Sequence, residues 1–211
     1  MQQVWYVAYG SNLSLERFRC YLAGGTPVGG VRRYDGCRDR RDAHATVSLH
    51  APGGLVFSGR STVWGGGMAF YDERRPGRVA CRGYLVTVDQ FADVVAQEMR
   101  RPPGGAFSRR LAGVLADGGS VNALGSGRYE TLARIAVMGD APMFTVTCGD
   151  IGNLEPSAPS ASYLRCIATG LREAHGWDAA RSAGYLAGCP GVEGSYTFDD
   201  LVAVVGDVVT P

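Results

Sequence analysis

The sequence contains no lysine: all 21 of its basic residues are arginine. GC-rich codon usage is the simplest explanation of this bias. Schiff-base chemistry on an enzyme amine requires a lysine, and so does the phosphate-binding P-loop. The sequence therefore excludes Schiff-base catalysis by a lysine and a phosphate-binding P-loop.

Cysteine pairs and histidine clusters with metal-ligand spacing are also missing. The six cysteines are widely spread, without a C-x-x-C pair, and His44, His50 and His175 are scattered along the chain. Zinc sites and disulfide scaffolds both require closely spaced ligands or pairs. We therefore expect no metal site, no cofactor and a reduced, cytoplasmic protein.

Long hydrophobic runs and a strong net charge are absent as well. No apolar stretch approaches the roughly 18 residues of a membrane helix, and the start Met1-Gln2-Gln3 lacks the basic, apolar pattern of a signal peptide. The net charge of +1 provides no field that would recruit nucleic acid or an anionic membrane. The expected partner is a small molecule, and a homodimer is one expected assembly.

The hydrophobic pattern predicts an α+β fold, in which a small mixed β-barrel or sheet has helices packed outside it. The 211 residues suit a single domain, 1–211, with a probable insertion at about 102–127. Strands are expected at 4–8, 68–71, 79–88, 129–138 and 143–148. Helices are expected at 15–22, from a cap at Asp89, and at 109–115, 160–175 and 178–186; the valines of 199–205 suit a helix or a strand.

The loop after the first strand is the first candidate site. Tyr9, Gly10, Ser11, Asn12 and Leu13 join a strand end to a helix start, which leaves backbone N–H groups unpaired and close together. Such amides bind a carboxylate or a developing oxyanion. Gly10 lets a ligand approach the backbone closely, and Asn12 tolerates a positive φ. By spacing alone, an ordinary strand-to-helix turn explains the same residues.

Glu98 is the second candidate because it falls on or beside the apolar stripe that contains Phe91 and Val94. A carboxylate on a packed face loses solvent, which favours its action as a base near neutral pH. By pattern alone, the favoured explanation is that Glu98 reaches water at the edge of the stripe, or pairs with Arg100 or Arg101.

Tyr129 and Tyr163 are candidates for polar contacts inside a cleft, although tyrosines more often lie in a core with one satisfied hydroxyl. A cysteine nucleophile would need a histidine beside it, which sequence alone does not place.

The segment Val7-Ala8-Tyr9-Gly10-Ser11-Asn12-Leu13 is similar to the F-A-Y-G-S-N-L signature of γ-glutamylcyclotransferase-like proteins. Further matches follow in the family's order: 64–69 resembles its W-x-G-G-x-A strand, and 83–98 its G-x-x-W/Y strand and the helix that bears its catalytic Glu. Tyr129 resembles the Tyr that opens the next strand, and 159–170 its P-S-x-x-Y…I-x-x-G helix.

The resemblance implies a γ-glutamylcyclotransferase-like fold and a metal-independent lyase. Glu98 would be the catalytic residue, and Tyr9, Gly10, Ser11, Asn12, Leu13, Tyr129 and Tyr163 would bind a γ-glutamyl amide. Attack of the substrate's own α-amine would release 5-oxoproline and an amine. Glu98 should then face the loop across a pocket about one glutamyl group wide.

Three departures from the family pattern put the substrate in question. Met99 follows Glu98 where many relatives have glycine, the 102–127 segment is long, and 29–59 is rich in arginine and glycine. The alternatives are the same chemistry on a γ-glutamyl-type acyl group of a specialised metabolite, a non-catalytic small-molecule binding module, and a Cys or His hydrolase sensitive to alkylation.

Overall fold

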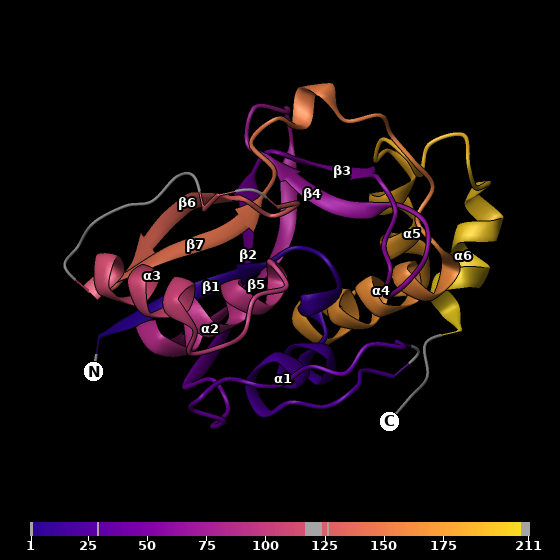
Figure 1. The fold of residues 1–211 in the computed structure, drawn as a ribbon. Helices are drawn as coiled ribbons and strands as arrows, with labels where there is room; N and C mark the ends of the chain where they lie inside the picture. Colours follow the sequence, from indigo (N-terminus) through magenta and orange to yellow (C-terminus); the bar gives the residue numbers. More distant parts are fainter. Residues whose placement is uncertain (1, 29, 117–123, 126, 208–211) are drawn as a thin grey trace.

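A five-stranded mixed sheet forms the centre of the protein, which is represented by a computed structural model describing residues 2–28, 30–116, 124–125 and 127–207 (Figure 1). Its strand order is β2-β5-β1-β7-β6, with β1 parallel to β7 and the other neighbours antiparallel. A separate hairpin, β3-β4, lies beside it. The strands are β1 (Gln3–Ala8), β2 (Ala45–Pro52), β3 (Gly54–Ser58), β4 (Met68–Asp72), β5 (Arg78–Thr87), β6 (Thr131–Met138) and β7 (Ala141–Thr147).

The predicted α+β class is confirmed, in its sheet form rather than its barrel form. The described strands make an open sheet, with β2 and β6 as its edges. The helices are α1 (Leu15–Ala23), α2 (Val88–Glu98), α3 (Ala106–Ala116), α4 (Ala161–His175), α5 (Ala179–Ala187) and α6 (Phe198–Gly206). The ambiguous segment 199–205 is thus helical, and no helix among the described residues is long and apolar enough to cross a bilayer.

The alternation of side chains along β1 divides the core in two. Val4, Tyr6 and Ala8 pack with buried residues of α1, α2 and α3, whereas Trp5, Val7 and Tyr9 pack with those of α4, α5 and α6. Successive residues of a strand point to opposite faces of the sheet, so one apolar strand supports both layers. Figure 1 shows α2 and α3 at one side of the sheet and the α4–α6 group at the other.

The predicted cap of α2 at Asp89 is wrong, because Thr87 caps this helix. The Thr87 hydroxyl accepts a hydrogen bond from the Gln90 amide, and the Gln90 side-chain oxygen accepts one from the Thr87 amide, each at 3.1 Å. These reciprocal bonds form a capping box and satisfy two amides that would otherwise lack partners at the helix start. Asp89 lies in the first turn and pairs instead with Arg38.

Replacing Thr87 with alanine should lower the free energy of unfolding by about 1 kcal/mol, because it removes this cap. Thr197→Ala is the matched control, since Thr197 and Asp200 form the same box at the start of α6. Urea unfolding of both variants measures the loss. An unchanged unfolding midpoint for Thr87→Ala would show that the box contributes nothing to α2.

The predicted helix within the insertion is confirmed, and it packs against α2. Leu111 and Leu115 of α3 are buried in the same core cluster as α2. Asp93 of α2, which has no exposed surface, accepts hydrogen bonds from the Gly104 amide (2.7 Å) and the Ser108 hydroxyl. The insertion is therefore fixed to the helix that bears Glu98; its positions 117–123 and 126 lie outside the described residues.

Candidate active site

A cavity of about 280 Å³ opens at the carboxyl end of β1, between the loop that follows it and the end of α2. The loop forms a short 3₁₀-helix, η1 (Ser11–Leu13). Side chains from β1, α1, α2 and α4 all reach the cavity, as do residues of the 61–64 and 127–129 segments. Elements far apart in the sequence thus converge on one hollow.

Glu98 lies at this convergence, half-buried at the last position of α2. Its Oε1 accepts hydrogen bonds from Asn12 Nδ2 at 2.8 Å and from the Tyr6 hydroxyl at 3.3 Å. Asn12 Nδ2 also lies 2.9 Å from the Tyr6 hydroxyl oxygen. These contacts engage one carboxylate oxygen, and Oε2 makes no hydrogen bond to a described residue.

The distance between Glu98 and the loop differs from the sequence-based expectation. Instead of standing one glutamyl group away, the carboxylate touches the Asn12 side chain directly. The room for a ligand is the adjoining cavity, which both residues line. Asn12 therefore orients the Glu98 carboxylate through Oε1, and Glu98 Oε2 remains available to a ligand.

The backbone of the loop supplies further donors. The Leu13 amide donates to the Gly10 carbonyl (2.9 Å) and the Ser14 amide to the Ser11 carbonyl (3.1 Å), whereas the amides of Ser11 and Asn12 donate to no described group. Two neighbouring N–H groups at the rim of a cavity suit an anion or an oxyanion.

The positive φ that Asn12 could tolerate is not adopted in this loop. Gly10 has φ −113°, and in the described part of the chain Arg100 is the one non-glycine residue with a positive φ. Glycine is needed at position 10 for space, since a Cβ there would lie 3.0 Å from the Tyr163 hydroxyl.

Tyr9, Tyr129 and Tyr163 all line the cavity, each with its hydroxyl engaged by backbone. The Tyr9 hydroxyl donates to the Val146 carbonyl at 2.7 Å, and Tyr129 donates to the Ala69 carbonyl at 3.1 Å. The Tyr163 hydroxyl accepts from the Ala69 amide at 3.3 Å. Burial raises the pKa of all three hydroxyls above the usual value, so they remain neutral and shape the wall of the cavity.

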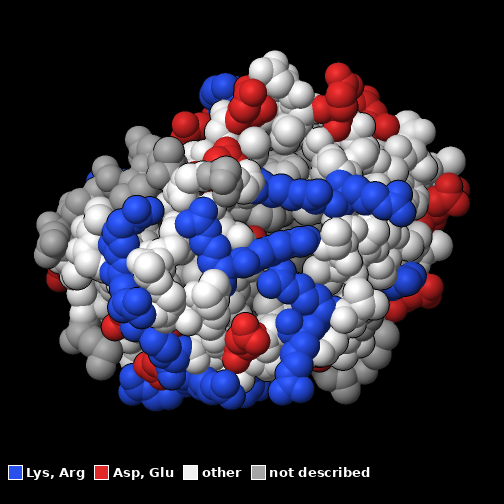
Figure 2. Space-filling model, viewed as in Figure 1, with Lys and Arg blue, Asp and Glu red and all other residues white. Residues whose placement is uncertain are grey.

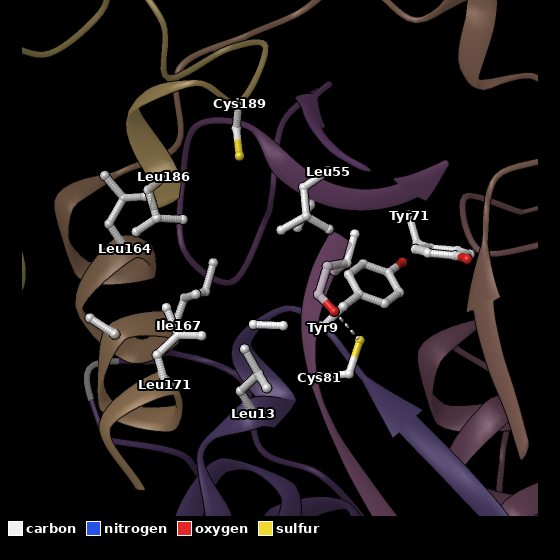
Figure 3. Close-up of a cluster of buried hydrophobic side chains, with 14 of the residues drawn as sticks. Tyr9, Leu13, Leu55, Tyr71, Cys81, Leu164, Ile167, Leu171, Leu186 and Cys189 are labelled. Atoms are coloured by element: carbon white, nitrogen blue, oxygen red, sulfur yellow. Dashed lines mark hydrogen bonds between the residues drawn. The ribbon is translucent and has the colours of Figure 1, made fainter. Parts of the chain in front are cut away.

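Leu13 has a different place from the other loop residues. Its side chain does not line the cavity but is fully buried in the core. Figure 3 shows it facing Ile167 and Leu171 of α4. Leu13 therefore anchors the loop rather than contacting a ligand through its side chain.

Four of the cavity residues that sequence analysis missed are buried: Tyr6, Arg17, Tyr21 and Tyr34. Tyr6 could have been found from strand alternation, which places it on the face of α2. Arg17 and Tyr21 are four residues apart on α1 and therefore share a helix face, so an arginine on the same face as a tyrosine was the available signal. Tyr34 had no such signal because it lies in a loop.

The cavity is basic. The charged residues that line it are Arg17, Arg32, Arg100, Arg128 and Glu98. None of these four arginines forms an ion pair with a carboxylate of the described residues, and Figure 2 shows arginine side chains converging on a hollow at the centre of this face. An excess of positive charge in a hollow favours anionic ligands.

The groups needed for two other chemistries do not meet at this cavity. None of the six cysteines or three histidines lines it. Within residues 2–28, 30–116, 124–125 and 127–207, no three His, Cys, Asp or Glu side chains gather in a way that could hold a metal ion.

No protein-family model matches this chain. The chain is 28% identical over 185 residues to histone deacetylase 5 of Arabidopsis thaliana; the match covers 81% of this chain and spans 28% of that protein. Similar solved structures include a γ-glutamyl cyclotransferase, at 15% identity and a TM-score of 0.49 with 96% of this chain and 99% of that one covered. An uncharacterised human protein is similar at 16% identity and a TM-score of 0.46, with the same coverage.

Proposed function

We propose that this protein cleaves a γ-glutamyl amide by cyclisation, releasing 5-oxoproline and an amine. The observation that carries the proposal is the carboxylate of Glu98, held through Oε1 by Asn12 beside the free amides of the loop. The motif resemblance of 7–13 and 83–98 to the γ-glutamylcyclotransferase-like family supports the same chemistry.

The proton is handled by Glu98. Its Oε2 takes a proton from the substrate's α-ammonium, and the freed nitrogen attacks the γ-carbonyl carbon to form the lactam bond. Glu98 then returns the proton to the amide nitrogen, and the bond to the leaving amine breaks so that a neutral amine departs. The lactam nitrogen loses its second proton to the regenerated carboxylate, which passes it to water. One positioned carboxyl group can serve as base and then as acid, which contributes about 10²–10⁴-fold to such reactions.

The nucleophile is part of the substrate, so the protein supplies no attacking group. Orienting two reacting groups already joined by a chain can supply roughly 7–11 kcal/mol of the barrier. The amides of Ser11 and Asn12 would stabilise the oxyanion of the tetrahedral intermediate, at about 3 kcal/mol for each donor in comparable sites. The reaction therefore requires a base and oxyanion donors but no attacking group from the protein. The lining of the cavity offers Glu98, backbone amides and neutral tyrosines.

A substrate panel tests the proposal. The purified protein is incubated with γ-glutamyl dipeptides and with bulkier γ-glutamyl amines, and 5-oxoproline is measured by chromatography and mass spectrometry. Release from the dipeptides supports the general activity, and release from the bulky amines alone would indicate the specialised-metabolite alternative. Failure to release 5-oxoproline from any of them would refute the proposal.

Replacing Asn12 with aspartate should shift the pH profile of turnover upward. Asn12 Nδ2 lies 2.8 Å from Glu98 Oε1, so the substitution brings two carboxylates together. Like charges at this distance disfavour joint ionisation, which raises the apparent pKa of the pair. Turnover should fall at neutral pH and recover as the pH rises, measured as kcat/KM against pH.

Asn12→Ala is the matched control for this experiment. It removes the amide donor without adding charge, so it should lower kcat/KM without the upward shift. If the aspartate and alanine variants have the same profile, Asn12 does not act on Glu98 through charge.

The remaining alternatives are less well supported. A Cys or His hydrolase would need these residues at the cavity, where none is present. A Glu98 that is solvated or ion-paired would favour a binding module without catalysis, whereas its Oε1 is held by Asn12. The deacetylase activity in the name of the Arabidopsis relative belongs to a protein of which this chain spans 28%.

A further inference from the structure

Arg17 is a buried arginine on the wall of the cavity. It lies in the first turn of α1 and has only 4% of its surface exposed, while still lining the hollow. By contrast, Arg100 and Arg128 are exposed and Arg32 is half-buried. Arg17 is thus the one deeply buried cation among the residues that line this cavity.

Two tyrosines hold the guanidinium in place. Arg17 Nη2 donates to the Tyr34 hydroxyl at 2.7 Å and to the Tyr21 hydroxyl at 3.2 Å. The guanidinium carbon also lies 4.4 Å from the centre of the Tyr34 ring and 4.6 Å from that of Tyr21. Two hydrogen bonds from Nη2 and the contacts with the faces of two rings leave the guanidinium little freedom of orientation.

The remaining donors of Arg17 have no partner. Both Nε and Nη1 are buried and form no hydrogen bond in the structure. Burial alone would lower the pKa of Arg17, but the oxygens of Tyr21, Tyr34 and Glu98 outweigh it and raise the pKa, so the side chain stays charged. Leaving N–H groups of a buried cation unpaired is costly, and an anionic ligand would remove that cost.

We propose that Arg17 binds the free α-carboxylate of the γ-glutamyl group and thereby places the α-amine beside Glu98. This assignment rests on the proposed cyclisation. Nε and Nη1 lie on different sides of the guanidinium, and a carboxylate oxygen can accept a charge-assisted hydrogen bond from either of these free donors. Binding of the α-carboxylate would make Arg17 a substrate-binding residue that determines specificity for a free α-carboxylate.

The geometry of the substrate favours the α-carboxylate over other anions. The α-carbon bears both the carboxylate and the attacking amine, so fixing one group restricts the position of the other. Glu98 and Arg17 line the same cavity, and Glu98 must reach the amine. A fixed cation near one substituent of the α-carbon and a base near another would orient the amine toward the γ-carbonyl.

The test compares two substrates that differ at one group: a γ-glutamyl amide with a free α-carboxylate, and its neutral α-carboxamide. The wild type should prefer the carboxylate by about 100-fold or more in kcat/KM, as expected for a site that pairs a buried charge. Arg17→Gln should lose this preference, because the carboxylate substrate slows by about that factor and the carboxamide hardly changes. Arg17→Lys should restore part of it, and Tyr34→Phe should reduce it less than Arg17→Gln.

An equal loss on both substrates would overturn the proposal, because it would indicate a purely structural role for Arg17. A wild type that does not discriminate between the substrates would also overturn it. Thermal unfolding of each variant shows whether the fold is retained, and Tyr34→Phe provides the second variant if Arg17→Gln does not fold.

Binding separates this inference from the proposed activity. Calorimetry should show that the wild type binds 5-oxoproline more tightly than its neutral carboxamide, and that Arg17→Gln does not discriminate between them. Discrimination by binding without any turnover would refute the cyclisation while supporting carboxylate binding at Arg17. Turnover without discrimination by either measurement would refute the role of Arg17 alone.

Discussion

Replacing Glu98 with glutamine is expected to lower kcat by roughly 10²–10⁴-fold, the range that general acid–base catalysis contributes. Glutamine retains the shape of the side chain and a carbonyl oxygen that can accept the Asn12 Nδ2 bond, which is 2.8 Å long in the wild type. It cannot take the proton of the α-ammonium. Rates of 5-oxoproline release under saturating substrate measure the effect.

The control for this variant is Glu193→Gln, which changes an exposed carboxylate that does not line the cavity. It should retain full activity. The unfolding temperature and the affinity for 5-oxoproline of Glu98→Gln should also stay close to the wild-type values, since the substitution is nearly isosteric. Normal turnover by Glu98→Gln would remove Glu98 from the mechanism.

Replacing Gly170 with alanine is expected to destabilise the protein and displace the loop. Gly170 lies in α4, and a Cβ there would lie 2.3 Å from the Leu13 Cβ and 2.5 Å from the Ser14 amide nitrogen. Real Cβ atoms do not approach this closely, so α4 and the loop must separate. Overpacking of this kind costs roughly 1–3 kcal/mol, occasionally more, and the displaced loop should also lower kcat/KM.

Gly184→Ala is the matched control, because a Cβ at this position of α5 would meet no atom within 4 Å. A glycine-to-alanine change at a free helical site stabilises by up to about 1 kcal/mol. Urea unfolding should therefore show opposite signs for the two variants. Equal effects of the two substitutions would mean that the contact between α4 and the loop does not constrain the loop.

Local sequence patterns predicted most of the elements but less of the site. Strand β1 and helix α4 followed from runs of apolar residues and cap signals, whereas the end of α2 at Glu98 followed from the family resemblance. The start of α2 was misplaced because an acidic residue in the first turn resembles a cap. Asn12 was interpreted through its tolerance of a positive φ, which the loop does not adopt. Its role comes instead from its side chain, which donates to Glu98.

The rest of the site depends on contacts between distant segments. Tyr6 and Glu98 are 92 positions apart and meet only because β1 and α2 pack together. Arg17 acquires its role from Tyr34, which lies in a loop without periodicity. The single domain over 1–211, a homodimer and the cytoplasmic location stay predictions.

The central claim is that the substrate's own amine, rather than water, attacks the γ-carbonyl. Turnover of a γ-glutamyl amide in water enriched in ¹⁸O tests it directly, with products analysed by mass spectrometry. Cyclisation predicts 5-oxoproline without ¹⁸O, released in equal amount with the amine. Glutamate bearing one ¹⁸O atom would show hydrolysis and contradict the account.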